Sequence, residues 1–221
     1  FNKILYISIN FIQKYSDEYG YNLSNIEIND LNYINNYEIL MYFDKFDKKS
    51  IFLIPIKKIS KDILNNKWIK TLDIQSDYRN TIKIVIEEEI PMGIYDNNTH
   101  KILFSKNLEI LKILENNDYS LELITFYGEN AIMNSKKLIS DLPLDFIDSV
   151  NSAIFVNKRR WNLRLKNFIL LKLPQKNIMH AINNYKKIYK NFSNKDLEVI
   201  ESIDLRINKQ AIIKYKKLKD D

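Results

Sequence analysis

Residues 159–174, RRWNLRLKNFILLKLP, contain the pattern that decides the fold of the C-terminal part of this chain. Apolar side chains alternate with basic or amide side chains from Arg160 to Lys166, which is the period of a half-buried β-strand. Asn167 interrupts the alternation, and a second apolar run ends at Pro174. We therefore predict a β-hairpin that turns near Lys166 and Asn167.

The residue that follows Asn167 is unusual for such a turn. A tight two-residue hairpin turn needs positive φ at both central positions and therefore favours Asn-Gly. Here the residue after Asn167 is Phe168. The local geometry of the hairpin is thus expected to differ from the common type.

The two faces of the predicted strand have different chemistry. Trp161, Leu163 and Leu165 share one face, so we assign Trp161 to the protein core and the basic face to solvent. A platform for single-stranded nucleic acid instead places aromatic rings among basic residues on one exposed face. The arginines of this strand and the basic run KYKKLK at residues 214–219 therefore do not by themselves indicate nucleic-acid binding.

Composition describes an ordinary globular chain of one or two domains. The chain has 221 residues, of which 45% are hydrophobic and 28% are charged, and its net charge is +6. A positive charge permits contact with nucleic acid, anionic lipid or an acidic protein, and selects none of them. Cysteine is absent, which excludes disulfides, thiolate metal sites and a cysteine nucleophile. With only 3 glycines there is no GxGxxG or Walker-type phosphate loop.

No residue cluster in the sequence predicts catalysis, a metal site or a cofactor. His100 lies in the polar turn DNNTH, and His180 lies off the apolar face of a predicted helix. Metal sites need several ligands at close spacing, so both histidines are expected in solvent. The consecutive carboxylates Glu87–Glu89 lie on a predicted strand and point to alternate faces, so they do not form a paired-carboxylate site.

The N-terminal segment has a short apolar run, ILYISINFI at residues 4–12. A membrane-spanning helix needs ~20 apolar residues, so this run cannot cross a bilayer on its own. It is either a buried amphipathic segment or the outer end of a longer transmembrane helix. The residues alone leave both interpretations open.

Periodicity predicts a β-α-α-β-β unit that ends at Ile90, with Pro91 as a hinge because proline cannot continue a central strand ladder. In the last strand, Ile82, Ile84 and Ile86 alternate with polar residues or valine. The predicted elements are a strand at residues 22–28, a helix at 34–46, an extended start and then a helix within 51–65, and strands at 68–74 and 81–89.

The remainder predicts a mostly antiparallel sheet with helices packed against it, which makes the whole chain an α+β protein. Besides the hairpin at 160–173, the predicted strands are residues 93–95, 101–104, 121–126, 152–156, 198–207 and 210–216, and the predicted helices are 130–140 and 176–189. No internal repeat is evident.

Three separated motifs resemble the bacterial FtsQ/DivIB cell-division family, especially its α-proteobacterial members. Residues 66–95, NKWIKTLDIQSDYRNTIKIVIEEEIPMGIY, resemble the end of a POTRA domain joined to the next domain, with Trp68, Glu88 and Pro91 at matching positions. RRWNLRLKN followed by LKLP is similar to a hairpin of the family, and residues 202–215, SIDLRINKQAIIKY, are similar to its terminal strand pair. Four turn or strand-entry positions depart from the family pattern: Asp30, Lys67, Arg79 and Phe168.

The resemblance implies a fold, a location and a non-enzymatic function. It implies that residues 1–20 hold the end of a transmembrane helix and a juxtamembrane segment, residues 21–90 a POTRA domain, and residues 91–221 a β domain. The implied protein is a single-pass protein of the inner membrane with its bulk in the periplasm at the division septum. It would be a divisome scaffold that binds FtsB and FtsL, contacts other divisome components through the POTRA domain, and helps control septal peptidoglycan synthesis without a cofactor.

The resemblance also implies a partner-binding site along the terminal hairpin. An FtsB strand would add to the last strand, where Ile212, Ile213 and Tyr215 supply the contacts. Arg206 would lie in the preceding strand, and Arg159 and Arg160 would pair with an acidic residue of FtsB. The alternative for the edge is that it is left in solvent and protected by Lys214 and Lys216. The alternatives for the whole protein are a POTRA-containing component of outer-membrane assembly or secretion and a basic nucleic-acid-binding module.

Overall fold

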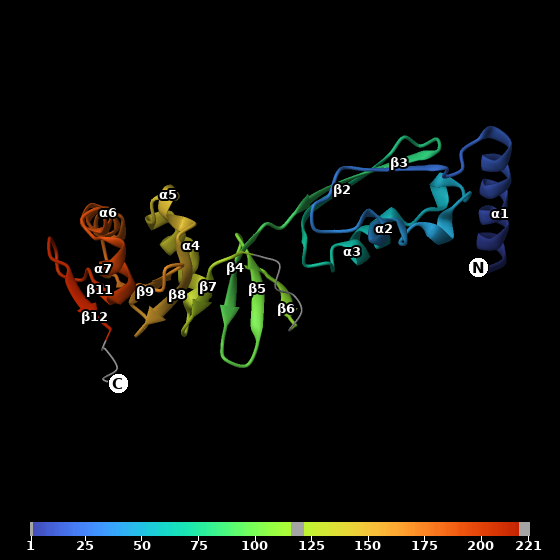
Figure 1. The fold of residues 1–221 in the computed structure, drawn as a ribbon. Helices are drawn as coiled ribbons and strands as arrows, with labels where there is room; N and C mark the ends of the chain where they lie inside the picture. The colour runs from blue at the N-terminus through green and yellow to red at the C-terminus, as the bar shows by residue number, and fades with distance from the viewer. Residues whose placement is uncertain (1, 116–121, 217–221) are drawn as a thin grey trace. The chain divides into compact units, whose positions relative to one another are not determined.

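A computed structural model of the chain describes residues 2–115 and 122–216, with side chains from Tyr6 onward. The chain divides into two compact units, Phe1–Ile90 and Pro91–Asp221, and each has its own hydrophobic core. Each unit is described here by itself (Figure 1).

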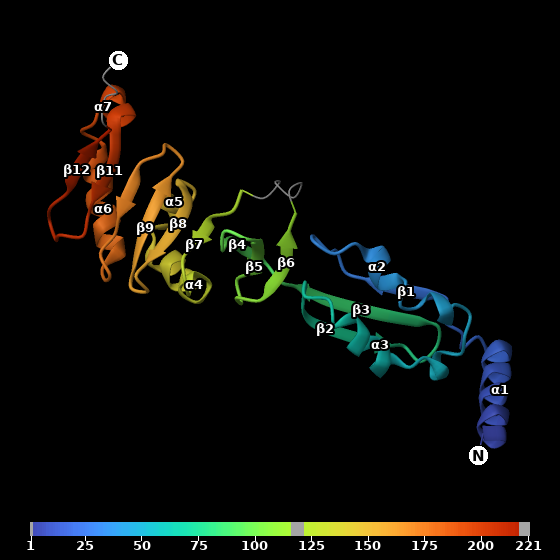
Figure 2. The same ribbon diagram turned by 90° about the horizontal axis from the view of Figure 1, so that it is seen from below.

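The first unit packs two short helices against one face of a three-stranded sheet (Figures 1 and 2). The sheet order is β1-β3-β2, in which β3 pairs with β1 in parallel and with β2 antiparallel. This arrangement confirms the predicted β-α-α-β-β order. The elements are α1 Asn2–Tyr19, β1 Asn25–Ile28, α2 Asn36–Leu40, the 3-10 helices η1 Asp44–Phe46 and η2 Ile51–Leu53, α3 Ile56–Ile63, β2 Ile69–Ser76 and β3 Thr81–Glu88.

Strand β3 supplies the centre of the first core. Ile82, Ile84 and Ile86 are buried, while the residues between them are exposed, as the alternation predicted. Ile59 and Ile63 of α3 are buried in the same core. One face of the sheet is therefore sealed by a helix, which is the condition for a strand of this pattern to be stable.

Two predictions in this unit are wrong in detail. The helix predicted at residues 34–46 ends at Leu40, and the chain then turns so that Phe43 is buried before the short η1. The expected extended start at residue 51 is instead the 3-10 helix η2. Ser50 explains this, because its N–H donates to the Gln13 side chain (3.0 Å), which fixes the segment against α1.

The second unit is built on one nine-stranded sheet with the order β12-β11-β10-β9-β8-β7-β4-β5-β6. Three neighbouring pairs are parallel, β10–β11, β7–β8 and β4–β7, and the other pairs are antiparallel. The strands are β4 Pro91–Asp96, β5 Lys101–Ser105, β6 Ile110–Leu114, β7 Thr125–Tyr127, β8 Val150–Val156, β9 Arg160–Leu165, β10 Leu170–Lys172, β11 Ile200–Asp204 and β12 Ile212–Tyr215.

Helices cover one face of this sheet, as Figure 1 shows for α4, α5 and α6. Trp161, Leu163 and Leu165 of β9 face these helices and are buried, which confirms the apolar face of the predicted hairpin. The predicted α+β class, with a mostly antiparallel sheet and packed helices, is thereby confirmed. The helices are α4 Ala131–Asp141, α5 Leu144–Ile147, α6 Ile178–Tyr189 and α7 Asn194–Val199.

The hairpin turn is one residue longer than a two-residue turn. Leu165 donates its N–H to the carbonyl of Ile169 (3.0 Å), and Phe168 donates to the carbonyl of Leu165 (2.9 Å). Phe168 has φ 68°, so the loop Lys166–Asn167–Phe168 places a non-glycine residue in the left-handed region. Three-residue hairpin loops commonly end in such a residue, and glycine is the usual choice.

Other boundaries near the ends of the second unit also differ from the predictions. The strand predicted at residues 198–207 begins only at Ile200, because Ser193 and Asp196 form a capping box that starts α7. Strand β6 and helix α5 were not predicted. Part of the strand predicted at residues 121–126 lies outside the described residues, and β7 begins at Thr125.

Pro91 is the first residue of β4 and pairs with Ser105. A register shift follows it before Gly93, and proline is tolerated at the first residue of a strand and at such bulges. The division between the two units falls directly before this residue. Its role as a hinge stays a prediction.

Candidate partner-binding edge

Strand β12 forms one edge of the large sheet (Figure 1). Within the described parts of the chain it pairs only with β11, so one side of its backbone has no strand beside it. Such an edge presents a row of unpaired N–H and C=O groups that another strand can join.

The backbone of Ile213 and Tyr215 faces this open side. Lys216 donates its N–H inward to the carbonyl of Val199 (2.8 Å). Because the direction of these groups alternates along a strand, Lys214 and Ile212 also point toward β11, and the two residues between them point outward. The structure thus turns the backbone of two of the sequence-predicted residues toward the open side of the edge.

The side chains of the same strand divide between core and solvent. Ile213 is partly buried and packs against the core of the second unit, which holds β12 in place. Ile212 and Tyr215 are more than half exposed, so their apolar surface is accessible to a partner. All three residues named from the sequence are therefore at the edge, with different roles.

The two lysines that could discourage pairing are turned toward their own sheet. Lys214 Nζ lies 2.7 Å from Glu201 Oε1, and Lys216 Nζ donates to the carbonyl of Glu198 (2.6 Å). The bond from Lys214 lowers the pKa of the Glu201 carboxyl, and the charges of Lys172 and Arg164 act in the same direction. The positive charge of Lys214 is thus partly neutralised by the carboxylate of Glu201 in β11.

The arginines occupy three different settings. Arg159 is exposed in the turn before β9, and Arg160 is the partly buried first residue of β9. Arg160 bonds Asn162 Oδ1 through Nη1 (3.3 Å), while its buried Nε has no hydrogen-bond partner among the described residues. Arg206 follows β11 rather than lying in it, which corrects the prediction, and its Nε donates to Asp204 Oδ1 (2.8 Å).

Asp204 and Glu201 are the site residues that sequence reasoning missed. The bond from Arg206 holds the pKa of the Asp204 carboxyl below its usual range. The spacing of Asp204 and Arg206 was a usable signal, because residues two apart lie on the same side of an extended chain. Arg206 is therefore already paired within the protein and is a weaker candidate for contact with a partner carboxylate.

Strand register sets the distance between the arginines and the edge. Asn162 of β9 pairs with Lys172 of β10, and Lys172 pairs with Asp204 of β11. Asp204 in turn pairs with Ile212 of β12. Neighbouring strands are about 4.8 Å apart, so β9 and β12 are separated by about 14 Å and a strand added to β12 would lie about 19 Å from β9. Arg159 and Arg160 are at the same end of the sheet as Ile212, and an added strand alone does not reach them.

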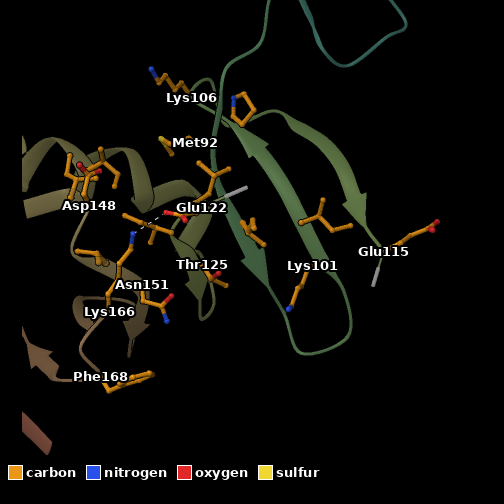
Figure 3. Close-up of a pocket in the computed structure, with 18 residues that line it drawn as sticks. Met92, Lys101, Lys106, Glu115, Glu122, Thr125, Asp148, Asn151, Lys166 and Phe168 are labelled. Carbon is orange, nitrogen blue, oxygen red and sulfur yellow. Dashed lines mark hydrogen bonds and ion pairs between the residues drawn. The ribbon is translucent and has the colours of Figure 1, made fainter. Parts of the chain in front are cut away.

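A separate hollow of about 980 Å³ opens on the second unit between β4, β6 and the helices α4 and α5 (Figure 3). Lys166 and Glu122 form an ion pair (3.4 Å) at its rim, and Phe168 lies at one side. One exposed ring, Phe168, thus lies beside Arg164 and Lys166, while Trp161 is only 4% exposed. Single-strand platforms stack several bases on successive rings, which one ring does not provide.

The described residues hold neither a metal-binding cluster nor a membrane-spanning helix. No group of three or more His, Cys, Asp or Glu side chains in the described residues is placed to hold a metal ion. His100 and His180 are both exposed, as expected. Within residues 2–115 and 122–216, no helix combines the length and the apolar character that crossing a bilayer requires.

The folds and the open edge define a class of protein: a POTRA domain followed by a larger sheet domain with a free strand edge. Family models agree with this description and are more specific. Residues 21–89 match the FtsQ-type POTRA domain, and residues 93–206 match the C-terminal region of cell division protein FtsQ/DivIB. The chain belongs to the FtsQ/DivIB family.

Individual relatives give the same result. The chain is similar to cell division protein FtsQ of Rickettsia bellii, with 30% identity over 219 residues that cover 95% of this chain and 78% of the relative. It is 28% identical to FtsQ of Rickettsia typhi over 92% of this chain and 77% of the relative. FtsQ of Rhizobium meliloti is 22% identical over 78% of this chain and 56% of the relative. The chain is therefore a cell-division protein whose family acts through protein interactions at the division site.

Proposed function

We propose that this chain is a non-enzymatic scaffold of the divisome. In this proposal it binds FtsB and FtsL-like division proteins outside the cytoplasmic membrane and helps control septal peptidoglycan synthesis. The POTRA domain contacts other divisome components. The observation that carries the proposal is the open β12 edge, where the backbone of Ile213 and Tyr215 faces outward and the flanking lysines are drawn inward.

The spacing of the site indicates a partner with two parts. A strand added to β12 gains main-chain hydrogen bonds and the exposed surface of Ile212 and Tyr215. Because β9 is about 19 Å from such a strand, a second segment of the partner carries the carboxylate that meets Arg159 or Arg160. Arg159 is exposed and Arg160 is only partly buried, so both guanidinium groups are accessible to such a carboxylate.

Anchoring in the inner membrane belongs to the same proposal. The bulk of the chain lies in the periplasm at the septum, and α1 joins it to the membrane as a single-pass protein. Support comes from the apolar side chains of Tyr6, Ile7 and Phe11, which are exposed on α1. The competing role in outer-membrane assembly has no observation in its favour, because both domains match FtsQ-type models.

Capture of the extracytoplasmic segment of FtsB by folded variants tests the proposal. Ile213→Pro removes an outward-facing N–H, so we expect it to abolish capture. Ile213→Val keeps that N–H and is the matched control, which should bind as the parent chain does. Loss of capture by the valine variant as well would assign the effect to core packing instead of the edge.

The arginine contact has its own expected result. Arg160→Glu should weaken capture several-fold, with an effect that shrinks as salt is raised, because exposed charge contacts are screened. Lys57→Glu makes the same change in net charge at an exposed position of the other unit and serves as the control. Full capture by both Ile213→Pro and Arg160→Glu would rule out this surface.

A further inference from the structure

Helix α1 exposes several large apolar side chains before it reaches the body of the first unit. Tyr6 is 67% exposed and Phe11 is 71% exposed, and Ile7 and Ile9 are also exposed. These positions are distributed around the helix, since successive residues turn by 100°. Ser8 and Asn10 are exposed between them, so this half of α1 is only partly apolar, and contact with lipid would remove its large apolar side chains from water.

The second half of the same helix is fixed to the first unit by a polar latch. Ser16 Oγ donates to Ser50 Oγ (2.7 Å), and both serines are fully buried. Gln13 accepts from the N–H of Ser50 (3.0 Å) and donates to the carbonyl of Lys48 (3.4 Å). The buried bond between the two serines holds one geometry and the Gln13 bonds add to it, so α1 has a fixed direction relative to the sheet of this unit.

An aromatic row continues from α1 onto the domain. Tyr15 stacks on Tyr19 (4.4 Å between ring centroids) and on Tyr21 (6.2 Å), and Tyr21 contacts Phe52 of η2 (5.7 Å). Phe52 is 53% exposed although it belongs to a short helix that contacts α1. We name these four residues, Tyr15, Tyr19, Tyr21 and Phe52, the aromatic collar.

The position and composition of the collar fit the interface of a phospholipid bilayer. Tyrosine is enriched at the level of lipid headgroups, and a lysine at the same level can extend its amine to water. Residues 1–16 include Lys3 and Lys14 and no acidic residue, and acidic residues begin at Asp17. By helical rise, Tyr15 lies about 4.5 Å beyond Ile12 and Tyr19 about 10 Å beyond it. The headgroup layer is about 5 to 7 Å thick, so the backbone of Tyr15 falls within it and that of Tyr19 lies about 3 Å or more outside it, with a side chain that tilts back toward the helix N-terminus.

We propose that the aromatic collar is a lipid-binding surface that seats the first unit in the headgroup layer of the membrane. The latch makes α1 a rigid support, so that Phe52 and Tyr21 of the domain enter the same layer as Tyr15. This inference rests on the proposed anchoring of the chain through α1. It adds that the domain itself contacts lipid, at a defined face.

Single labels test the proposal in the whole chain, because the sequence has no cysteine and one introduced thiol is unique. An environment-sensitive fluorophore is attached at Phe52→Cys, and vesicles of phosphatidylethanolamine and phosphatidylglycerol are added. We expect a blue shift and at least a ~3-fold reduction in quenching by aqueous iodide, as expected for a group moved from water into the lipid interface. Tyr6→Cys reports on anchoring through α1. Tyr78→Cys, 71% exposed in the turn between β2 and β3, is the control and should stay in water.

The outcomes separate the collar from the anchor. Protection at residue 6 with residue 52 in water would overturn the collar and leave the anchoring intact. Exposure at both positions would overturn both proposals. Equal protection at residue 78 would show adsorption without a preferred face, and protection at residue 52 without vesicles would assign the surface to a second copy of the chain. Each of these results contradicts the collar.

A latch variant tests the rigid support. Gln13→Ala combined with Ser16→Ala removes the side-chain bonds to the Ser50 and Lys48 segment. We expect the label at residue 52 to return to water while the label at residue 6 stays protected. Continued protection at residue 52 would show that the latch does not position the collar.

Discussion

Phe168 combines a left-handed backbone conformation with an exposed aromatic side chain. It has φ 68° and is 72% exposed at the tip of the β9–β10 hairpin. A left-handed backbone conformation costs an L-residue about 1 to 2 kcal/mol. Glycine avoids this cost but loses more conformational entropy on folding, so the net gain from glycine is smaller. We therefore expect Phe168→Gly to raise the free energy of unfolding by about 1 kcal/mol in urea denaturation. Phe168→Ala keeps the Cβ atom and should give no such gain. An equal gain from alanine would assign the effect to the exposed ring.

Glu88 explains one of the family motifs at the level of single atoms. Its carboxylate accepts the backbone N–H groups of Asn32 (2.6 Å), Tyr33 (2.8 Å) and Ile34 (2.8 Å). These groups precede α2 and need partners from outside the helix. The glutamate of the Glu-x-x-Pro match thus ties the end of β3 to the start of α2.

The charge of Glu88 makes the stability of the first unit depend on pH. Burial raises the pKa of Glu88, but the three backbone bonds outweigh burial and hold that pKa below its ordinary value of 4.5. A carboxyl with a lowered folded pKa stabilises the protein above its unfolded pKa, and this stabilisation is lost as pH falls through the folded pKa. We expect Glu88→Gln to reduce the free energy of unfolding by about 1 to 2 kcal/mol at pH 7 and by less below pH ~4. Glu18→Gln, at an exposed position of α1, is the control. A Glu88→Gln effect that stayed constant from pH 7 to pH 3 would contradict the role of the charge.

Single elements show where periodicity was sufficient and where it was not. The alternation in β9 and β3 was read correctly because each strand has one face against helices and one face toward solvent. Strand β6, with the sequence ILKIL, has no such alternation, and it is a strand because it pairs with β5. Helix α7 did have a local signal, the Ser193 and Asp196 capping box. The strand predicted at residues 198–207 therefore begins two residues too early, because residues 198 and 199 belong to α7.

The two faces of β9 can be compared by mutation. Trp161 is buried against the rings of Phe126 and Phe155, so Trp161→Ala should reduce the free energy of unfolding by about 3 to 5 kcal/mol. Arg164 is on the opposite face and bonds only the carbonyl of Phe168 among the described residues, so Arg164→Ala should cost about 1 kcal/mol or less. Thermal and chemical denaturation measure both. An unchanged melting temperature for Trp161→Ala would remove Trp161 from the core.

At the scale of the whole molecule, the order of three motifs predicted the fold class and the family. It did not predict the geometry of the site. Residues 159–160 and residues 212–215 are far apart in sequence, and their separation in space depends on β10 and β11 pairing in parallel between them. That pairing is non-local, and nothing in the local pattern of either strand specifies it. The sequence therefore predicted that Ile212, Ile213 and Tyr215 lie on the last strand, but gave no reason to separate the arginines from it; the role of these residues in binding stays a prediction.

The membrane topology of the chain is a prediction that concerns the whole molecule. The exposed apolar half of α1 and membership of the FtsQ/DivIB family support a chain whose residues from 21 onward are outside the cytoplasm. The net charge of +6 does not oppose this, because the positive-inside bias fades for long translocated domains. Alkaline phosphatase fused after Asp221 of the full-length protein should therefore be active in cells, and a fluorescent protein that folds only in the cytoplasm should be dark. Deletion of the segment through Tyr19 should reverse both signals. An inactive phosphatase on the undeleted protein would place β12 in the cytoplasm, where an extracytoplasmic strand cannot reach its edge, and the anchoring and the scaffold proposals would fail together.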